Sequence, residues 1–235
     1  MKPQQPRKPQ KLRIDDLLSF EPLTAGQEIV YEAWREGDHI VLNGSAGTGK
    51  TFTAMYLGLE EVLDKGTDKN KLILVRSVVP TKDVGFLPGS LEEKIEVYTM
   101  PYRAICSELF EDSSAYDKLV ENHSIEFIST SYIRGVTISD AVIIVDEMQN
   151  LTLHELDSII TRVGENCRIV FCGDYYQSDL TRKGDKDGIN KFIEILTQMN
   201  KFTKVEFTWT DIVRSDFVRD YIMTKEMLEK AQIPQ

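Results

Sequence analysis

A glycine-rich segment lies between an apolar run and a helical pattern near residue 50. In order, the segment is Gly44, Ser45, Ala46, Gly47, Thr48, Gly49, Lys50 and Thr51. It satisfies the spacing G-x-x-x-x-G-K-[ST], in which glycines let the backbone curl and point N–H groups inward at the positive end of a helix. In this arrangement Lys50 neutralises the β- and γ-phosphates of a nucleotide, and the Thr51 hydroxyl ligates Mg²⁺. The segment therefore predicts a triphosphate-binding loop in which all eight residues line the site.

Two adjacent carboxylates follow a second apolar run. Residues 142–145 are Val-Ile-Ile-Val, and Asp146 and Glu147 come directly after them. We expect Asp146 to complete the Mg²⁺ shell opposite Thr51, and Glu147 to orient or deprotonate the attacking water. A solvated strand end is the ordinary interpretation of such a pair alone. Beside the glycine-rich loop, the pair favours hydrolysis.

A glutamine follows a third apolar run. Residues 168–172 are Arg-Ile-Val-Phe-Cys, and Gly173 and Asp174 lead to Gln177. Ligands of open α/β sheets bind at the carboxyl ends of strands. Gln177 is therefore a candidate to hydrogen-bond the γ-phosphate or the water, with a polar turn residue as the alternative.

The elements that must position these residues alternate along the chain. Short β-branched or aromatic runs predict strands buried on both faces, and the segments between them have helical spacing. The predicted strands are 39–43, 71–75, 125–128, 141–145, 168–172 and 205–208, and the predicted helices are about 25–36, 50–64, 91–111, 153–162, 188–199 and 216–231. This alternation predicts an α/β fold with a mostly parallel sheet and helices on both faces. Residues 14–235 show no repeat or linker, so we expect a single domain.

Charge and apolar patterning exclude several classes of protein. The net charge is −10, yet residues 1–13 hold five basic residues and no acid. This composition predicts a flexible basic tail on an acidic remainder. It disfavours a globally basic nucleic-acid binder, so any contact with RNA or DNA needs a local patch. No run approaches the roughly 18 apolar residues of a membrane span, and no secretory signal follows the first charges.

Cysteine and histidine usage points to a reducing compartment. The three cysteines form no C-x-x-C pair, and the three histidines are scattered, which gives no metal-ligand spacing. We expect three free thiols in a cytosolic protein.

Taken together, these motifs resemble the PhoH family of P-loop ATPases, which is related in motif to superfamily 1 helicases. The likeness covers roughly residues 22–222. The matching segments are 85–89 with Glu93, Lys94 and Pro101, then 132–137, 146–150, 161–164, 173–180 and 211–214. Three positions depart from the pattern: Met148 replaces a small alanine, Ser45 a proline, and Val136 a polar residue. None of these departures removes a group that hydrolysis needs. The short chain looks like a phage or compact bacterial version, which would act in the host or bacterial cytoplasm.

The resemblance implies a RecA-like P-loop NTPase core and roles for two further residues. Gln27, just before the first helix, looks like the glutamine that reads the hydrogen-bonding edge of adenine; an exposed polar residue at the helix start is the alternative. Arg214 looks like the arginine that touches the γ-phosphate in the transition state, a role that suits a permanently charged bidentate donor. Arg76, Arg134 and Arg162 are either surface ion pairs or contacts to phosphate, a second subunit or nucleic acid.

A single core of this type also implies a partner. Superfamily 1 helicases close ATP between two lobes of one chain, whereas this sequence supplies one, which leaves the γ-phosphate face open to water. A neighbouring subunit is the simplest second wall, and the resemblance implies a hexameric ring. The leading hypothesis is Mg²⁺-dependent ATP hydrolysis coupled to binding or remodelling of single-stranded RNA or DNA, in the manner of a helicase.

Three other functions compete with this hypothesis. A nucleotide-dependent switch or assembly ATPase would act through a protein partner without unwinding, and the acidic balance favours it. A small-molecule kinase lacks an obvious substrate lid. A GTPase lacks the base-reading N-K-x-D motif.

Overall fold

The computed structural model describes residues 11–78, 91–133, 135, 137–174 and 183–231, with the backbone alone at 91–94, 183–187 and 229–231. Its centre is a six-stranded sheet of order β3-β2-β4-β5-β1-β6, in which every adjacent pair is parallel. The strands are β1 (His39–Gly44), β2 (Lys71–Arg76), β3 (Ile125–Ser129), β4 (Ala141–Val145), β5 (Arg168–Gly173) and β6 (Phe202–Phe207). The α/β prediction is confirmed.

Seven α-helices are described. They are α1 (Ala25–Glu36), α2 (Lys50–Leu63), α3 (Leu91–Phe110), α4 (Ala115–Glu121), α5 (Leu153–Ile160), α6 (Lys183–Gln198) and α7 (Asp216–Ala231). Six of them match predicted helices, with α6 beginning earlier than expected. Helix α4 is not predicted from the sequence, because its seven residues span only two turns and give too little periodicity to detect.

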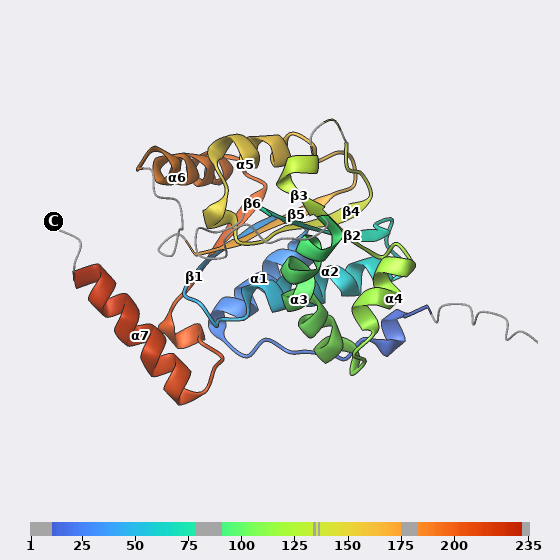
Figure 1. The fold of residues 1–235 in the computed structure, drawn as a ribbon, viewed down its shortest axis with the longest axis horizontal. Coiled ribbons are helices and arrows are strands. Elements are labelled where there is room, and N and C mark those ends of the chain that lie inside the picture. Colours follow the sequence, from blue (N-terminus) through green and yellow to red (C-terminus); the bar gives the residue numbers. More distant parts are fainter. Residues whose placement is uncertain (1–10, 79–90, 134, 136, 175–182, 232–235) are drawn as a thin grey trace, which may run out of the picture.

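Helices cover both faces of the sheet, as predicted. Figure 1 shows α5 and α6 on one face and α1 to α4 on the other. Successive side chains of β1 enter opposite layers: Ile40 and Leu42 belong to the apolar cluster under α1 to α4, and Val41 belongs to the cluster under α5 and α6. This double burial explains why the strands read as continuous apolar runs.

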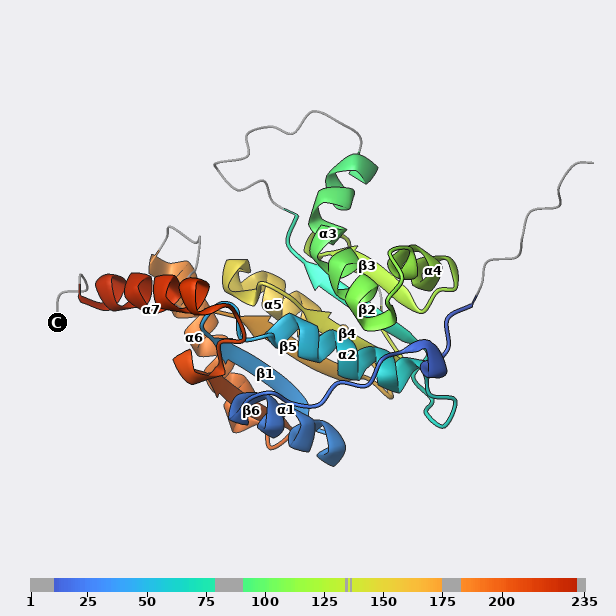
Figure 2. The same ribbon diagram turned by 90° about the horizontal axis from the view of Figure 1, so that it is seen from below.

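The last helix stands apart from both layers. Figure 2 shows α7 beyond the sheet, on the side of β1 and β6. At the other end of the chain, residues 1–10 of the predicted basic tail lie outside the described residues, whereas Leu12 is buried in the cluster under α1 to α4. Within the described ranges, no helix combines the length and apolarity needed to cross a bilayer.

Candidate nucleotide-binding site

Three neighbouring strands end at the same edge of the sheet with residues that the sequence singled out. Because β5 lies between β1 and β4, the glycine-rich loop and Asp146 flank the end of β5. Gly173 and Asp174 lie there, and Gln177 falls outside the described residues. A pocket of about 840 Å³ opens at this edge, and residues 46–53, Asp146 and Arg214 line it.

The glycine-rich loop is shaped by positions that only glycine fits. Gly44 has φ +132°, and a Cβ there would collide with the carbonyl of Phe207 at the end of β6. Gly49 has φ +80° and forms the N-cap of α2, so the chain turns directly from the loop into the helix. Inside the loop, the Thr48 hydroxyl donates to the carbonyl of Ser45 at 3.0 Å. These glycines and this hydrogen bond together shape the turn from β1 into α2.

Lys50, the first residue of α2, folds back into this loop. Its Nζ donates to the carbonyls of Gly44 and Ser45 at 2.8 and 2.7 Å and to the Thr48 hydroxyl at 3.3 Å. Burial lowers the pKa of the ammonium, and the carboxylate of Asp174 partly opposes this shift. The positive charge therefore lies inside the glycine-rich loop, against the carbonyls of Gly44 and Ser45.

Thr51 and Asp146 come together from different elements. The Thr51 hydroxyl donates to Asp146 Oδ1 at 2.8 Å, and the hydroxyl of Tyr102 on α3 donates to Asp146 Oδ2 at 2.9 Å. Asp146 is buried, and both of its oxygens are held. Hydroxyl and carboxylate oxygens are the protein ligands that suit Mg²⁺ bound together with substrate phosphates. These two residues therefore fit a magnesium site.

Glu147 is turned toward the same pocket by an unusual backbone. Its φ of +52° is left-handed, and it opens the 3₁₀ turn Met148–Asn150. Burial and the neighbouring Asp146 raise the pKa of Glu147. The Gln149 amide donates to Glu147 Oε2, and Gln149 Oε1 accepts from the backbone N–H of Asp174 at 3.1 Å. Gln149 therefore ties this carboxylate to the end of β5.

Met148, where the family pattern has alanine, is accommodated by a glycine on β5. Met148 is fully buried, and a Cβ on Gly173 would lie 2.5 Å from Met148 Cγ. The larger side chain at residue 148 thus fills space that Gly173 leaves open. The departure from the family pattern leaves the turn after Glu147 intact.

Gln27 lies within the first turn of α1, and not just before the helix as the sequence suggests. It is 6% exposed, and its Nε2 donates to the Thr48 carbonyl at 3.1 Å while its Oε1 accepts from the Leu23 N–H at 2.8 Å. Asp211 fixes this helix start by accepting from the Gly26 N–H at 3.0 Å. The amide of Gln27 therefore borders both the loop and the pocket.

Arg214 lies across the glycine-rich loop of its own chain. The Val213 N–H donates to the Gly47 carbonyl at 3.0 Å, and a Cβ on Gly47 would lie 2.9 Å from Arg214 Cγ. The side chain of Arg214 is exposed and lines the pocket. Three further arginines are candidates for phosphate, subunit or nucleic-acid contacts. Arg76 and Arg162 are half-buried, and Arg134 lies outside the described residues.

A buried carboxylate from α7 reaches the back of the loop. Glu226 is 4% exposed, and its Oε2 accepts from the Ser45 hydroxyl at 3.0 Å and from Trp209 Nε1 at 2.6 Å. Sequence reasoning missed Glu226 and Tyr102, because no motif marks either of them. It also gave no role to Gln149 and Asp211, although both stand inside motifs that it quoted.

The family and its fold follow from comparisons with known proteins. Residues 19–226 match the family described as PhoH-like protein. The PhoH-like protein of Bacillus subtilis strain 168 is 35% identical over 87% of this chain and 63% of its own length. Protein PhoH of Escherichia coli K12 is 34% identical over 75% of this chain and 49% of its own length.

Among solved structures, the large terminase from a thermophilic bacteriophage, in complex with ADP, matches with a TM-score of 0.50. It is 14% identical over 85% of this chain and 49% of that chain, so the likeness concerns the fold alone. The fold is a RecA-like P-loop NTPase core. The chain spans about three fifths of the length of the B. subtilis relative. Because the match to this family covers most of its residues, the chain belongs to the PhoH-like protein family.

Proposed function

We propose that this protein binds ATP at the pocket beside β1 and hydrolyses it with Mg²⁺. One observation carries the proposal: the hydroxyl of Thr51, at the start of α2, lies 2.8 Å from Oδ1 of Asp146, after β4, directly beside the glycine-rich loop. A phosphate-binding loop and a pair of magnesium-type ligands are the two parts that P-loop NTPases share. The terminase with the same fold was solved with ADP, which supports the choice of nucleotide.

The triphosphate is held by the loop and Lys50. The loop N–H groups and the dipole of α2 favour negative charge at this point, and the Lys50 ammonium adds a positive group held inside the loop. Thr51 and Asp146 would hold Mg²⁺, which neutralises charge on the phosphates when it is bound. A pocket of about 840 Å³ is within the size range of small-molecule sites.

Water activation falls to Glu147. Its raised pKa reflects a buried carboxylate beside a second one, which is the environment that makes a carboxylate a better base. Gln149 fixes one oxygen of Glu147, which leaves the other to hold a water. Arg214 would stabilise the charge that develops on the γ-phosphate, and Gln177 would orient the phosphate or the water.

Gln27 is proposed to read adenine, and a selectivity measurement tests this. Gln27→Ala is expected to reduce the preference for ATP over GTP by about tenfold or more, because the site would lose its donor–acceptor pair for the base edge. Competition of both nucleotides against a fluorescent analogue gives the ratio. Gln198→Ala, at an exposed glutamine at the end of α6, is the matched control. An unchanged ATP/GTP ratio in Gln27→Ala would contradict the role.

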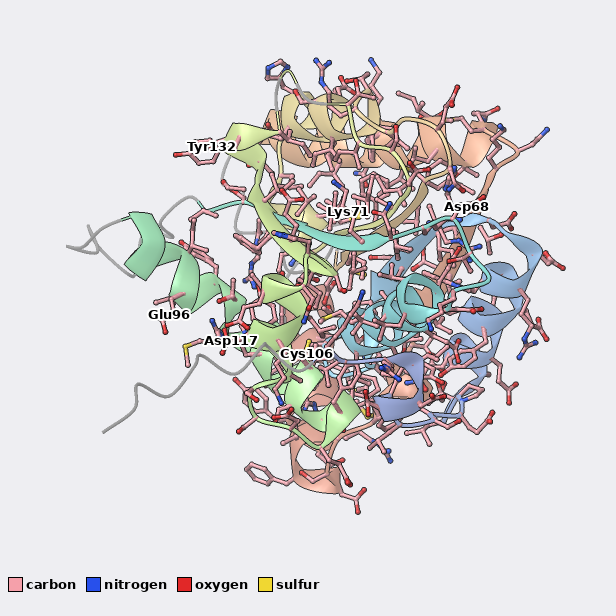
Figure 3. All side chains as sticks on the ribbon, turned by 90° about the vertical axis from the view of Figure 1, so that its right-hand side faces the viewer. Asp68, Lys71, Glu96, Cys106, Asp117 and Tyr132 are labelled. Carbon is pink, nitrogen blue, oxygen red and sulfur yellow. The ribbon has the colours of Figure 1, made fainter. Side chains whose placement is uncertain are left out.

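We propose that hydrolysis is coupled to single-stranded RNA or DNA. Tyr132 supports this, because its side chain is 60% exposed in the 3₁₀ turn Thr130–Tyr132, directly after edge strand β3. Figure 3 shows Tyr132 projecting away from the body of the molecule. Exposed aromatic rings stack on unpaired bases. The ring lies at the same edge of the sheet as the ATP pocket, since all strands are parallel.

ATP turnover with and without single-stranded RNA and DNA, at low and moderate salt, tests this coupling. We expect stimulation that weakens as salt rises, since phosphate contacts release counterions. No stimulation at any salt would favour the alternative, a nucleotide-dependent switch or assembly ATPase that acts through a protein partner. The acidic balance of the chain is the observation that favours this alternative.

We further propose that the chain assembles as a homo-oligomer, in a hexameric ring. One face of α7 exposes apolar side chains, with Phe217 at 82%, Tyr221 at 65% and Leu228 at 59% exposure. Their spacing places them on the same side of the helix.

A cytosolic location fits the three free cysteines, Cys106, Cys167 and Cys172.

A further inference from the structure

A buried tyrosine outside the motifs of the site contacts the proposed magnesium ligand. Tyr102 lies on α3, directly after Pro101, and its side chain is fully buried. Its hydroxyl donates to Asp146 Oδ2 at 2.9 Å. We propose that Tyr102 is a positioning residue that orients Asp146 for Mg²⁺, an inference that rests on the proposed function.

The two oxygens of Asp146 have different partners, one facing the proposed metal site and the other facing Tyr102. Oδ1 accepts from the Thr51 hydroxyl, which is the group that would share the metal, and Oδ2 accepts from Tyr102 on the opposite side. Hydrogen bonds at both oxygens restrain the rotation of this carboxylate about its Cβ–Cγ bond. Tyr102 therefore keeps Oδ1 directed at Thr51. Hydrogen bonds of this kind orient metal ligands, and removing one typically costs 10- to 100-fold in metal affinity or activity.

The surroundings of Tyr102 hold its ring rigidly. It belongs to the apolar cluster under α1 to α4, and its centroid lies 6.1 Å from that of Phe127 on β3. The guanidinium of Arg76, at the end of β2, interacts electrostatically with both Tyr102 and Asp146. A rigid donor fixes its acceptor more closely than a mobile one. The orientation of Asp146 thus depends on α3 as well as on β4.

A purely structural role is the competing explanation, because buried tyrosine hydroxyls usually find a partner. The two explanations differ in what responds to Mg²⁺. A structural hydroxyl would change the stability of the chain alone. A positioning hydroxyl would change the Mg²⁺ concentration at which nucleotide binding tightens, with little effect on metal-free binding.

Binding of a fluorescent ATP analogue, titrated with Mg²⁺ and repeated in EDTA, separates them. For Tyr102→Phe we expect the Mg²⁺ half-saturation concentration to rise about tenfold or more, while the affinity in EDTA stays within about twofold. The matched control is Tyr116→Phe, at a buried tyrosine on α4. An unchanged Mg²⁺ half-saturation in Tyr102→Phe overturns the inference. Failure of the wild-type chain to bind the analogue with or without Mg²⁺ overturns the proposed function instead.

A double-mutant comparison adds a second test. If Tyr102 acts through Asp146, then in an Asp146→Ala background Tyr102→Phe produces no further shift in Mg²⁺ dependence. An additional shift of the full size would contradict the inference. Should Tyr102→Phe not fold, Tyr102→Met is the second variant, since its flexible apolar side chain fills a similar space without a hydroxyl.

Discussion

Glu147→Gln is expected to slow ATP hydrolysis by on the order of 10²-fold or more while ATP remains bound. An amide has nearly the same shape as the carboxylate but cannot accept the proton of the attacking water. In the wild-type chain the Gln149 amide donates to Glu147 Oε2. The glutamine in the variant keeps an oxygen that can accept this hydrogen bond. The turn after β4 should therefore stay in place, and the loss should fall on the chemical step alone.

Single-turnover hydrolysis of radiolabelled ATP, with equilibrium binding measured in parallel, checks this expectation. Glu165→Gln is the matched control, because Glu165 is exposed after α5 and away from the pocket. Turnover of Glu147→Gln at the wild-type rate would remove Glu147 from water activation. A parallel loss of binding would show that the carboxylate holds the nucleotide or the metal instead.

Lys50→Ala is expected to lose nucleotide affinity and turnover together, each by on the order of 10²-fold. In the proposed mechanism the Lys50 ammonium is the cation that the loop supplies to the phosphates, and its loss would leave the dipole of α2 and the backbone N–H groups to bind them. The carbonyls of Gly44 and Ser45 would also lose a donor. We therefore expect a modest fall in unfolding midpoint beside the loss of binding.

Isothermal titration with ATP and steady-state phosphate release measure both effects of Lys50→Ala. Lys65→Ala provides the control, because Lys65 is exposed just beyond the end of α2. If Lys50→Ala binds and turns over ATP as the wild type does, Lys50 has no part in the mechanism. A variant that binds normally but does not turn over would confine Lys50 to the transition state.

Much of the fold was predictable because its signals are local. Each strand is a short apolar run, and the glycine-rich loop adjoins both β1 and α2 in sequence. The meeting of Thr51 with Asp146, 95 residues apart, was predictable for a different reason. Parallel strands end at one edge of the sheet, so a motif after one strand meets a motif after a neighbouring strand.

The contacts that no motif announced come from outside those strand ends. Tyr102 reaches Asp146 from α3, and Glu226 reaches Ser45 from α7 across 181 residues. An isolated tyrosine or glutamate in a helical pattern looks like any core or surface residue. The fit of Met148 over Gly173 has the same origin, since it depends on how closely two strand ends approach.

The position of β5 has a consequence for how this architecture tolerates change. One strand, β5, separates β1 from β4, so the ends of these two strands lie two strand-to-strand steps apart, about 10 Å, and the side chains of Thr51 and Asp146 meet between them. The main-chain hydrogen bonds between the strands set this distance, and the side chains contribute little to it. We therefore expect substitutions among the apolar residues on either face of the sheet to leave the separation between the glycine-rich loop and the end of β4 unchanged.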